Sequence, residues 1–379
     1  MKDSQGSFFT VAADLVSVDE VISYSLYINS SGDKKRFKYV RIYPAGEFLA
    51  SKDLKNFKKK YFQLYVHESQ REIYLESLVK SPHITQKKKV EVIKGSAIKY
   101  LEKCFEGKRN VDSKLLTHII KGCQESVKNI IELTKNCNAG DIQKLIGSLS
   151  FHDFYTFDHS INVSMYSIVF LRDLDPKVKK KELMILGLGG LLHDLGKMNI
   201  ATSIINKADK LSDEEFQVIK EHPSFGGRIL EDHLESSSDI DITVIKRIIM
   251  EHHENFDGSG YPSGVQGDKI HLYARIISIV DFFDALTTKR SYHEVLSPQS
   301  AIDIMRGTIG KKIDPHLFEA FQKTINMIGT REKETLSLEE TFDPCQPQNI
   351  LPFKKYEAKK QAENFFGHKE EGESKKKSA

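Results

Sequence analysis

The fold of this chain is decided by residues 184–197, whose sequence is MILGLGGLLHDLGK. The first nine residues would be apolar on nearly every side of a helix, which predicts a helix buried among other elements. Each of its three glycines costs roughly 1 kcal/mol relative to alanine, which makes sense only if another helix approaches closely. The run ends in His193 and Asp194, whose polar groups need partners when buried. For these two residues alone, a hydrogen-bonded core pair is the simplest explanation.

Polar residues of the same kind recur in or beside other apolar runs. The set comprises five histidines and two aspartates: His159, His193, Asp194, His222, His252, His253 and Asp281. Gathered at one point, they would form a cage for two divalent ions. Imidazole and carboxylate ligands suit zinc, iron, manganese or nickel, and the lack of thiolates argues against a purely structural zinc site. A carboxylate that bridges two ions about 3.5–4 Å apart suits displacement at phosphorus, with a metal-bridging hydroxide as the nucleophile.

Three of these residues carry local predictions. His252 and His253 end the apolar run 242–250, and adjacent residues of a helix point about 100° apart. Both can reach one ion only beyond the helix end or where its last turn loosens, and the glycine-rich loop that follows supplies that freedom. His222 precedes Pro223, which predicts that His222 closes a helix.

Composition limits the class of protein. A chain of 379 residues should hold two or three domains. Its net charge of +3 gives no sign of nucleic acid or a membrane surface as a partner. The four cysteines form no CxxC pair, so neither a disulfide framework nor a thiolate zinc site is expected. Neither a signal peptide nor an apolar run of roughly 20 residues is evident, so we expect a cytoplasmic protein without membrane insertion.

Hydrophobic periodicity divides the chain into four parts and predicts a mainly α fold. Residues 1–80 alternate between apolar and polar residues and predict a small, β-rich α+β regulatory module. Residues 81–145 repeat at helical spacing and predict linker helices that could pair in a homodimer. Residues 146–330 are helical almost throughout and contain the cage, whereas the charged residues 331–379 predict a disordered tail.

With these residues in hand, the chain resembles the HD-GYP family, a branch of the HD metal-dependent phosphohydrolases. The match spans about residues 150–325, and this many motif residues in order are a specific signal, whereas His-Asp alone would be weak. The main motifs are His193-Asp194-Leu195-Gly196-Lys197, Glu221-His222-Pro223, His252-His253-Glu254, Asp257-Gly258, Gly260-Tyr261-Pro262, Asp281, Asp284-Ala285-Leu286-Thr287 and Arg290. The resemblance implies an all-helical HD-type catalytic domain of a bacterial phosphodiesterase that hydrolyses cyclic di-GMP to pGpG and often on to GMP.

The resemblance also implies a ligand set. One ion would be held by His159, His193, Asp194 and Asp281, and the other by His222, His252 and His253 with Asp194 bridging. Some members hold a third ion through a glutamate four residues before the first histidine, where this chain has Tyr155. Because a phenol is a poor substitute for a carboxylate, we predict two ions, with iron or manganese favoured over zinc or nickel.

Three further residues are expected to act on the substrate. By resemblance, Lys197 and Arg290 would contact phosphate groups, and Asp194 and Lys197 would be catalytic. The alternative for Lys197 is a solvated surface lysine. Tyr261 first serves the structure of its loop, which could also dock a diguanylate cyclase domain, and its ring could stack on guanine.

Two other functions stay open. The chain could be a non-catalytic cyclic di-GMP receptor or a scaffold that docks a diguanylate cyclase, although such members usually lose metal ligands and this chain keeps them. It could also be an HD hydrolase of another cyclic dinucleotide or of a nucleotide, because metal ligands act on phosphate alone. A substrate panel on one preparation would separate these functions.

Overall fold

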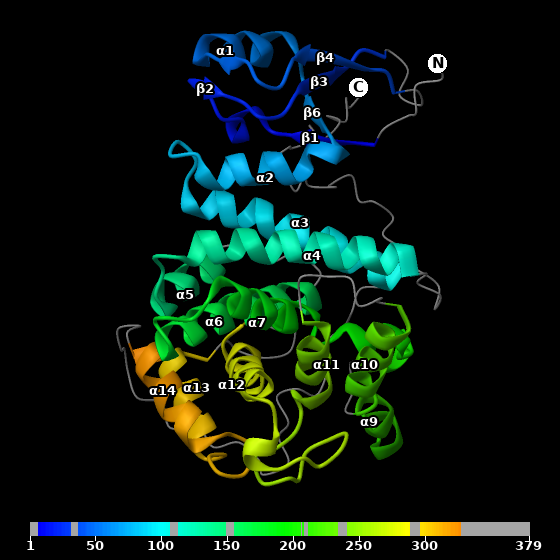
Figure 1. Ribbon diagram of the computed structural model, residues 1–379, viewed down its shortest axis with the longest axis vertical. Coiled ribbons are helices and arrows are strands. Elements are labelled where there is room, and N and C mark those ends of the chain that lie inside the picture. The colour runs from blue at the N-terminus through cyan, green and yellow to red at the C-terminus, as the bar shows by residue number, and fades with distance from the viewer. Residues whose placement is uncertain are drawn as a thin grey trace, which may run out of the picture. The chain divides into compact units, whose positions relative to one another are not determined.

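The computed structural model describes residues 7–31, 37–106, 113–148, 155–205, 207, 211–233, 241–288 and 296–326 (Figure 1). Its contacts divide the chain into two compact units, with the boundary between Ser96 and Ala97. The charged tail predicted for residues 331–379 lies outside the described residues. No helix of the described ranges is both long and apolar enough to cross a membrane.

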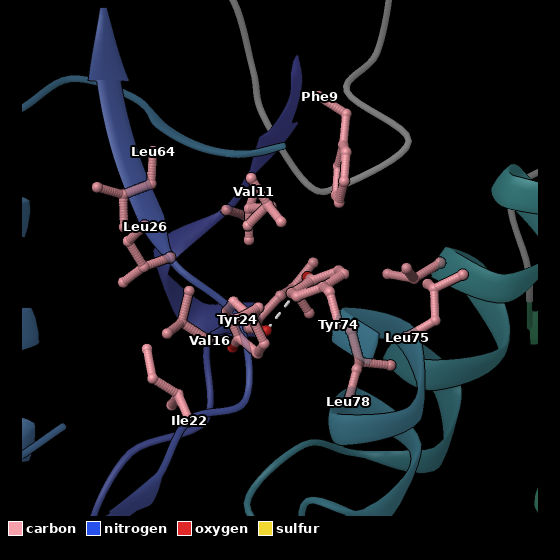
Figure 2. Packing of buried hydrophobic residues seen from close by; sticks show 14 of the residues in the cluster. Phe9, Val11, Val16, Ile22, Tyr24, Leu26, Leu64, Tyr74, Leu75 and Leu78 are labelled. Carbon is pink, nitrogen blue, oxygen red and sulfur yellow. Dashed lines mark hydrogen bonds between the residues drawn. The ribbon is translucent and has the colours of Figure 1, made fainter. Parts of the chain in front are cut away.

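The first unit is the predicted β-rich module. Strands β1 (Phe8–Val11), β3 (Leu26–Asn29), β4 (Tyr39–Tyr43) and β6 (Leu64–His67) form an antiparallel sheet in the order β1-β6-β3-β4, and β2 (Glu20–Val21) pairs with β5 (Phe48–Leu49). Leu64 and Val66 alternate with more exposed residues along β6 and are buried. Figure 2 shows this core, in which side chains of the sheet face Tyr74 and Leu78 of α2 (Arg71–Lys80). A further helix, α1 (Ser51–Lys60), follows β5.

The second unit is helical, which confirms the predicted mainly α fold. Its elements are the end of α3 (Gln86–Glu106), α4 (Ser113–Thr134), α5 (Ala139–Ser148), α6 (Tyr155–Leu174), α7 (Lys180–Leu192), η3 (Leu195–Asn199), α8 (Thr202–Ile205), α9 (Asp213–Ile219), α10 (His222–His233), α11 (Ile242–Glu251), η4 (Gly267–Lys269), α12 (Leu272–Thr287), α13 (Pro298–Arg306) and α14 (Pro315–Asn326). Helix α7 contacts α4, α6, α11 and α12, so it lies among the other helices of this unit (Figure 1).

The glycines of α7 allow its neighbours to come close, as predicted. A Cβ built on Gly189 would lie 2.7 Å from Ile248 of α11, and one on Gly190 would lie 3.0 Å from the Cα of Ser164 in α6. Both distances are too short for a side chain in a well-packed core. The close packing fixes the position of His193, which directly follows this helix.

Within the region predicted to be helical almost throughout, residues 213–233 form two helices instead of one. Helix α9 ends at Ile219, and α10 begins at His222 with Pro223 as its second residue. The prediction that His222 closes a helix is therefore wrong, since His222 opens one. Proline is tolerated in the first turn because the N–H that it lacks would have no helical partner there.

Candidate metal centre

The structure brings the seven expected ligands to one place. Ligand atoms of Asp194, His222, His252 and His253 lie within 4.8 Å of one another, as do those of His159, His193 and Asp281. The seven side chains come from α6, the ends of α7 and α11, the start of α10, and α12. His253 is half-buried and the other six are buried. We call these two sets the Asp194 group and the His159 group.

The carboxylate of Asp194 lies between a histidine of its own group and a histidine of the His159 group. Its Oδ2 is 3.4 Å from Nε2 of His193, and its Oδ1 is 3.4 Å from Nε2 of His222. Oδ1 is buried and accepts no hydrogen bond from any described residue. A buried charged oxygen without a partner is costly, so this atom is suited to a cation. Because each oxygen faces a different set of histidines, the carboxylate can serve both.

Backbone carbonyls orient three of the histidines. Nδ1 of His193, His222 and His252 lies 2.7–2.8 Å from the carbonyl oxygen three residues earlier in the chain. A neutral ring that donates from Nδ1 has a lone pair on Nε2, and here Nε2 is the nitrogen that faces the other ligands. Metal-binding histidines are usually held by such a hydrogen bond from the second ring nitrogen.

The clearest sign that these residues suit a cation is the pair His222 and His252. Their Nε2 atoms are 3.2 Å apart, and two lone pairs at this distance repel each other unless a proton or an ion lies between them. Burial lowers the pKa of His222 to about 4 although Asp194 opposes this, and it lowers the pKa of His252 well below its usual range. At neutral pH both rings are therefore neutral, and a divalent ion fits this donor set.

Two carboxylates hold His159. Its Nε2 is 2.9 Å from Oδ1 of Asp281, and its Nδ1 is 2.7 Å from Oδ2 of Asp284. Burial lowers the pKa of His159, but the hydrogen bonds to Asp281 and Asp284 together raise it to about 9. The fully buried Asp284 also accepts hydrogen bonds from Asn162 and Thr288, at 3.0 and 2.7 Å. Asp284 therefore fixes the orientation of a ligand.

Asp284 is absent from the predicted site residues, although the sequence contains a signal for it. It lies three residues after Asp281 in the same apolar helix, so both acids occupy one helical face. An acid inside such an apolar helix costs free energy unless it has a partner, and this holds equally for Asp281 and Asp284.

Lys197 lies beside Asp194 and is not a solvated surface residue. Its Nζ is 2.6 Å from Oδ2 of Asp194, and only 11% of its side chain is exposed. Burial opposes ionisation of Asp194, but Lys197 and His193 hold its pKa well below the usual range. A Cβ on Gly196 would lie 1.8 Å from the carbonyl oxygen of His222, so this glycine lets η3 approach α10 and places Lys197.

The Gly-Tyr-Pro loop is anchored against the site. The Tyr261 ring stacks on His253 with centroids 4.8 Å apart. Glu254, which is buried, accepts hydrogen bonds from the backbone N–H groups of Ser263 and Val265 at 2.7 and 3.1 Å. A Cβ on Gly260 would lie 2.1 Å from the backbone nitrogen of Asn255. These contacts hold the loop in one conformation against a ligand histidine.

Two of the expected positions cannot be placed. Arg290, the expected phosphate contact, lies outside the described residues. The side chain of Tyr155, at the position of a third-metal ligand, is likewise not described, although Tyr155 begins α6.

Known proteins resemble this region in sequence. Residues 149–317 match the family model described as HD domain. The chain is 37% identical over 178 residues to "Cyclic di-GMP phosphodiesterase PA4108" of Pseudomonas aeruginosa, over 46% of this chain and 40% of that protein. It is 34% identical over 174 residues to "3'3'-cGAMP-specific phosphodiesterase 3" of Vibrio cholerae, over 46% of this chain and 36% of that protein. The chain thus spans less than half the length of these two curated relatives.

A solved structure resembles the fold over most of the chain. Bd1817, an HDG"Y"P protein from Bdellovibrio bacteriovorus, superposes with a TM-score of 0.50 at 20% identity, over 84% of this chain and 99% of that one. At this identity the match concerns the fold alone. The family match defines residues 149–317 as an HD domain. The relatives and the motifs around the candidate metal centre agree with the HD-GYP resemblance of this domain.

Proposed function

We propose that the chain is a metal-dependent phosphodiesterase that hydrolyses cyclic di-GMP to pGpG, with GMP as the product of a second hydrolysis. The observation that carries this proposal is Asp194, whose two carboxylate oxygens each face a histidine of a different group. The names of relatives such as the Pseudomonas aeruginosa phosphodiesterase support the substrate.

The residues present fit two divalent ions, with iron or manganese favoured over zinc or nickel. The ions would be held by His159, His193, Asp194 and Asp281, and by Asp194, His222, His252 and His253. When bound, such a pair would activate water as the nucleophile and stabilise negative charge on the phosphoryl oxygens.

The chain's own residues would prepare the reaction. Asp194 stays ionised beside the ammonium group of Lys197, and this ammonium group can donate a hydrogen bond to a phosphate oxygen. Hydrolysis adds one water across a P–O3′ bond: the water oxygen bonds to phosphorus and the 3′ oxygen leaves as a hydroxyl. The rigid loop that carries Tyr261 supports His253 and would form part of the wall around the substrate.

The main experiment is a substrate panel on one preparation loaded with manganese or ferrous iron. We expect linearisation of cyclic di-GMP by the wild type and none by His193→Ala. Activity that survives this substitution, or that is absent with every metal tried, would exclude the proposal. Tight binding of cyclic di-GMP without any product over hours would instead indicate a receptor.

A second substrate has support from the comparisons. A relative that is 34% identical is named a 3'3'-cGAMP-specific phosphodiesterase, so the same panel includes this dinucleotide. The ratio of the two kcat/KM values decides which cyclic dinucleotide is preferred.

Partner binding is a finer part of the proposal. Asp257 and Ser259, in the loop that leads to Tyr261, are exposed, which supports docking of a diguanylate cyclase domain there. A homodimer through the helices of residues 81–145 stays a prediction, to be tested by the mass of the protein in solution.

A further inference from the structure

Lys220 is a cation next to the candidate metal centre that forms no ion pair with any described residue. It follows α9 and lies two residues before His222. Its Nζ is 4.7 Å from the centre of the Phe216 ring and 5.8 Å from the centre of the Tyr261 ring. The ammonium therefore lies near two aromatic faces instead of a carboxylate.

The Tyr261 ring connects this ammonium to the ligands of the Asp194 group. The ring stacks on His253 at 4.8 Å and meets the His222 ring at a centroid distance of 6.5 Å. Tyr261 therefore contacts both the Lys220 ammonium and two of the expected metal ligands. A single aromatic ring spans the distance from the metal centre to Lys220.

Other lysines of the same region have carboxylate partners. Lys197 pairs with Asp194, and Lys207 pairs with Glu215, each with N–O distances of 2.6 Å. Glu214, another acid of α9, receives a hydrogen bond from Ser212. An aromatic face attracts an ammonium but leaves its three N–H donors without an acceptor. Lys220 is thus held in place while its donors stay available to an anion.

We propose that Lys220 binds the phosphate group of the cyclic dinucleotide that is not being hydrolysed. This inference rests on the proposed function and deepens it. A cyclic dinucleotide carries two phosphodiester groups, each with one negative charge. The metal centre and Lys197 would hold the group that reacts, so the second group needs a cation outside the centre. Lys220 meets this requirement, since it carries an ammonium group, lies against two rings and pairs with no carboxylate of the described residues.

The test compares a substrate that carries a second phosphodiester group with a simple diester that lacks it. Cyclic di-GMP has two phosphodiester groups, whereas bis(4-nitrophenyl) phosphate has one. Wild type, Lys220→Gln and Lys220→Arg are assayed with both substrates, and the metal content and the Kd for cyclic di-GMP are measured on the same samples. Lys323→Gln serves as the matched control because Lys323 is exposed and pairs with Glu319 on the remote helix α14.

For Lys220→Gln we expect kcat/KM on cyclic di-GMP to fall about tenfold or more, mainly through KM, as a charged hydrogen bond predicts. The fall on the simple diester should be at least about fivefold smaller, and Lys220→Arg should recover most of the loss. Lys323→Gln should leave kcat/KM unchanged for both substrates, and the metal content should be equal in all four proteins.

Three results would overturn the inference. An unchanged KM for cyclic di-GMP in Lys220→Gln, with an active wild type, would exclude the proposed role of Lys220 and leave the proposed function intact. An equal fall on both substrates would show that Lys220 acts on the metal centre instead of the second phosphate. A wild type that cleaves the simple diester but neither binds nor cleaves cyclic di-GMP would remove the proposed function as well.

Discussion

At the scale of single residues, the site consists of lone pairs that point at one another without a proton between them. The Nε2 atoms of His222 and His252 are 3.2 Å apart, and Oδ1 of Asp194 accepts no hydrogen bond from any described residue. Such contacts would destabilise a protein that never binds a cation. Their presence at the point where seven ligand side chains meet is the strongest physical argument for a metal centre.

Acid should destabilise the metal-free protein through His222. Folded protein holds this ring neutral down to about pH 4, whereas an unfolded chain takes up the proton near pH 6.5. Between these values the unfolded state binds more protons, so stability falls as the pH drops. With a chelator present, His222→Asn should reduce the fall in Tm between pH 7 and pH 5. The exposed control His316→Asn should leave that fall unchanged, and an identical fall in wild type and His222→Asn would contradict this account.

Asp284→Asn should weaken the ion of the His159 group more than the other ion. Asp284 orients His159 through Nδ1, and loss of such a contact typically lowers metal affinity about 10–100-fold. At a free metal concentration that just fills both sites of the wild type, the content measured by mass spectrometry should fall from about two ions per chain to about one. Two ions bound with wild-type affinity would show that Asp284 serves folding alone.

Most of the candidate ligands could be predicted from the sequence because a polar side chain in or beside an apolar helix costs free energy unless it has a partner. His193, Asp194 and Asp281 adjoin or interrupt apolar helices, and each needs a partner that packing cannot supply. Asp284 obeys the same rule and belongs to one of the family motifs, but no role at the site was predicted for it. The contact between Glu254 and the loop could not be predicted, because it depends on the path of the backbone over residues 254–265.

At the scale of elements, helix packing decides where the ligands lie. Helix α7 was predicted from the uninterrupted apolar run 184–192, and it spans Lys180–Leu192. The break between α9 and α10 could not be predicted from periodicity, since apolar residues continue on both sides of residues 220 and 221. The structure shows that the new helix begins where His222 packs against Asp194.

Gly190→Ala should destabilise the protein by about 1–3 kcal/mol, as expected for overpacking. The added methyl would lie 3.0 Å from the Cα of Ser164, which is backbone and cannot turn aside. Chemical denaturation of the metal-free protein measures the change. Gly307→Ala is the control, because its Cβ would meet only the Ile304 carbonyl oxygen at 3.4 Å. Equal stability of the two variants would show that α6 can move away.

Glu254→Gln should loosen the Gly-Tyr-Pro loop. A glutamine has one oxygen where Glu254 uses two to accept from Ser263 and Val265, so one N–H would face an amide donor. Loss of such a buried charged acceptor costs about 1–3 kcal/mol. Limited proteolysis should become faster within the loop, and metal affinity of the Asp194 group should fall because Tyr261 supports His253. Unchanged cleavage, as expected for the exposed control Glu319→Gln, would argue against the anchor.

At the scale of the whole chain, a β-rich unit is combined with a helical unit that contains all seven candidate metal ligands. The alternation of apolar and polar residues predicted strands such as β6 correctly, because this two-residue period can be recognised even in a short strand. Helices α1 and α2 are short, and periodicity did not reveal where each begins. The ligands come from segments between His159 and Asp281, so only folding of the complete helical unit brings them together.

The most direct test of the central claim is anomalous diffraction from crystals of the full chain grown with manganese. We predict two anomalous peaks about 3.5–4 Å apart, one against each ligand group, with an oxygen of Asp194 bonded to each ion. A single peak, or two peaks of which one lacks Asp194 as a ligand, would contradict the bridging arrangement on which the proposed chemistry depends.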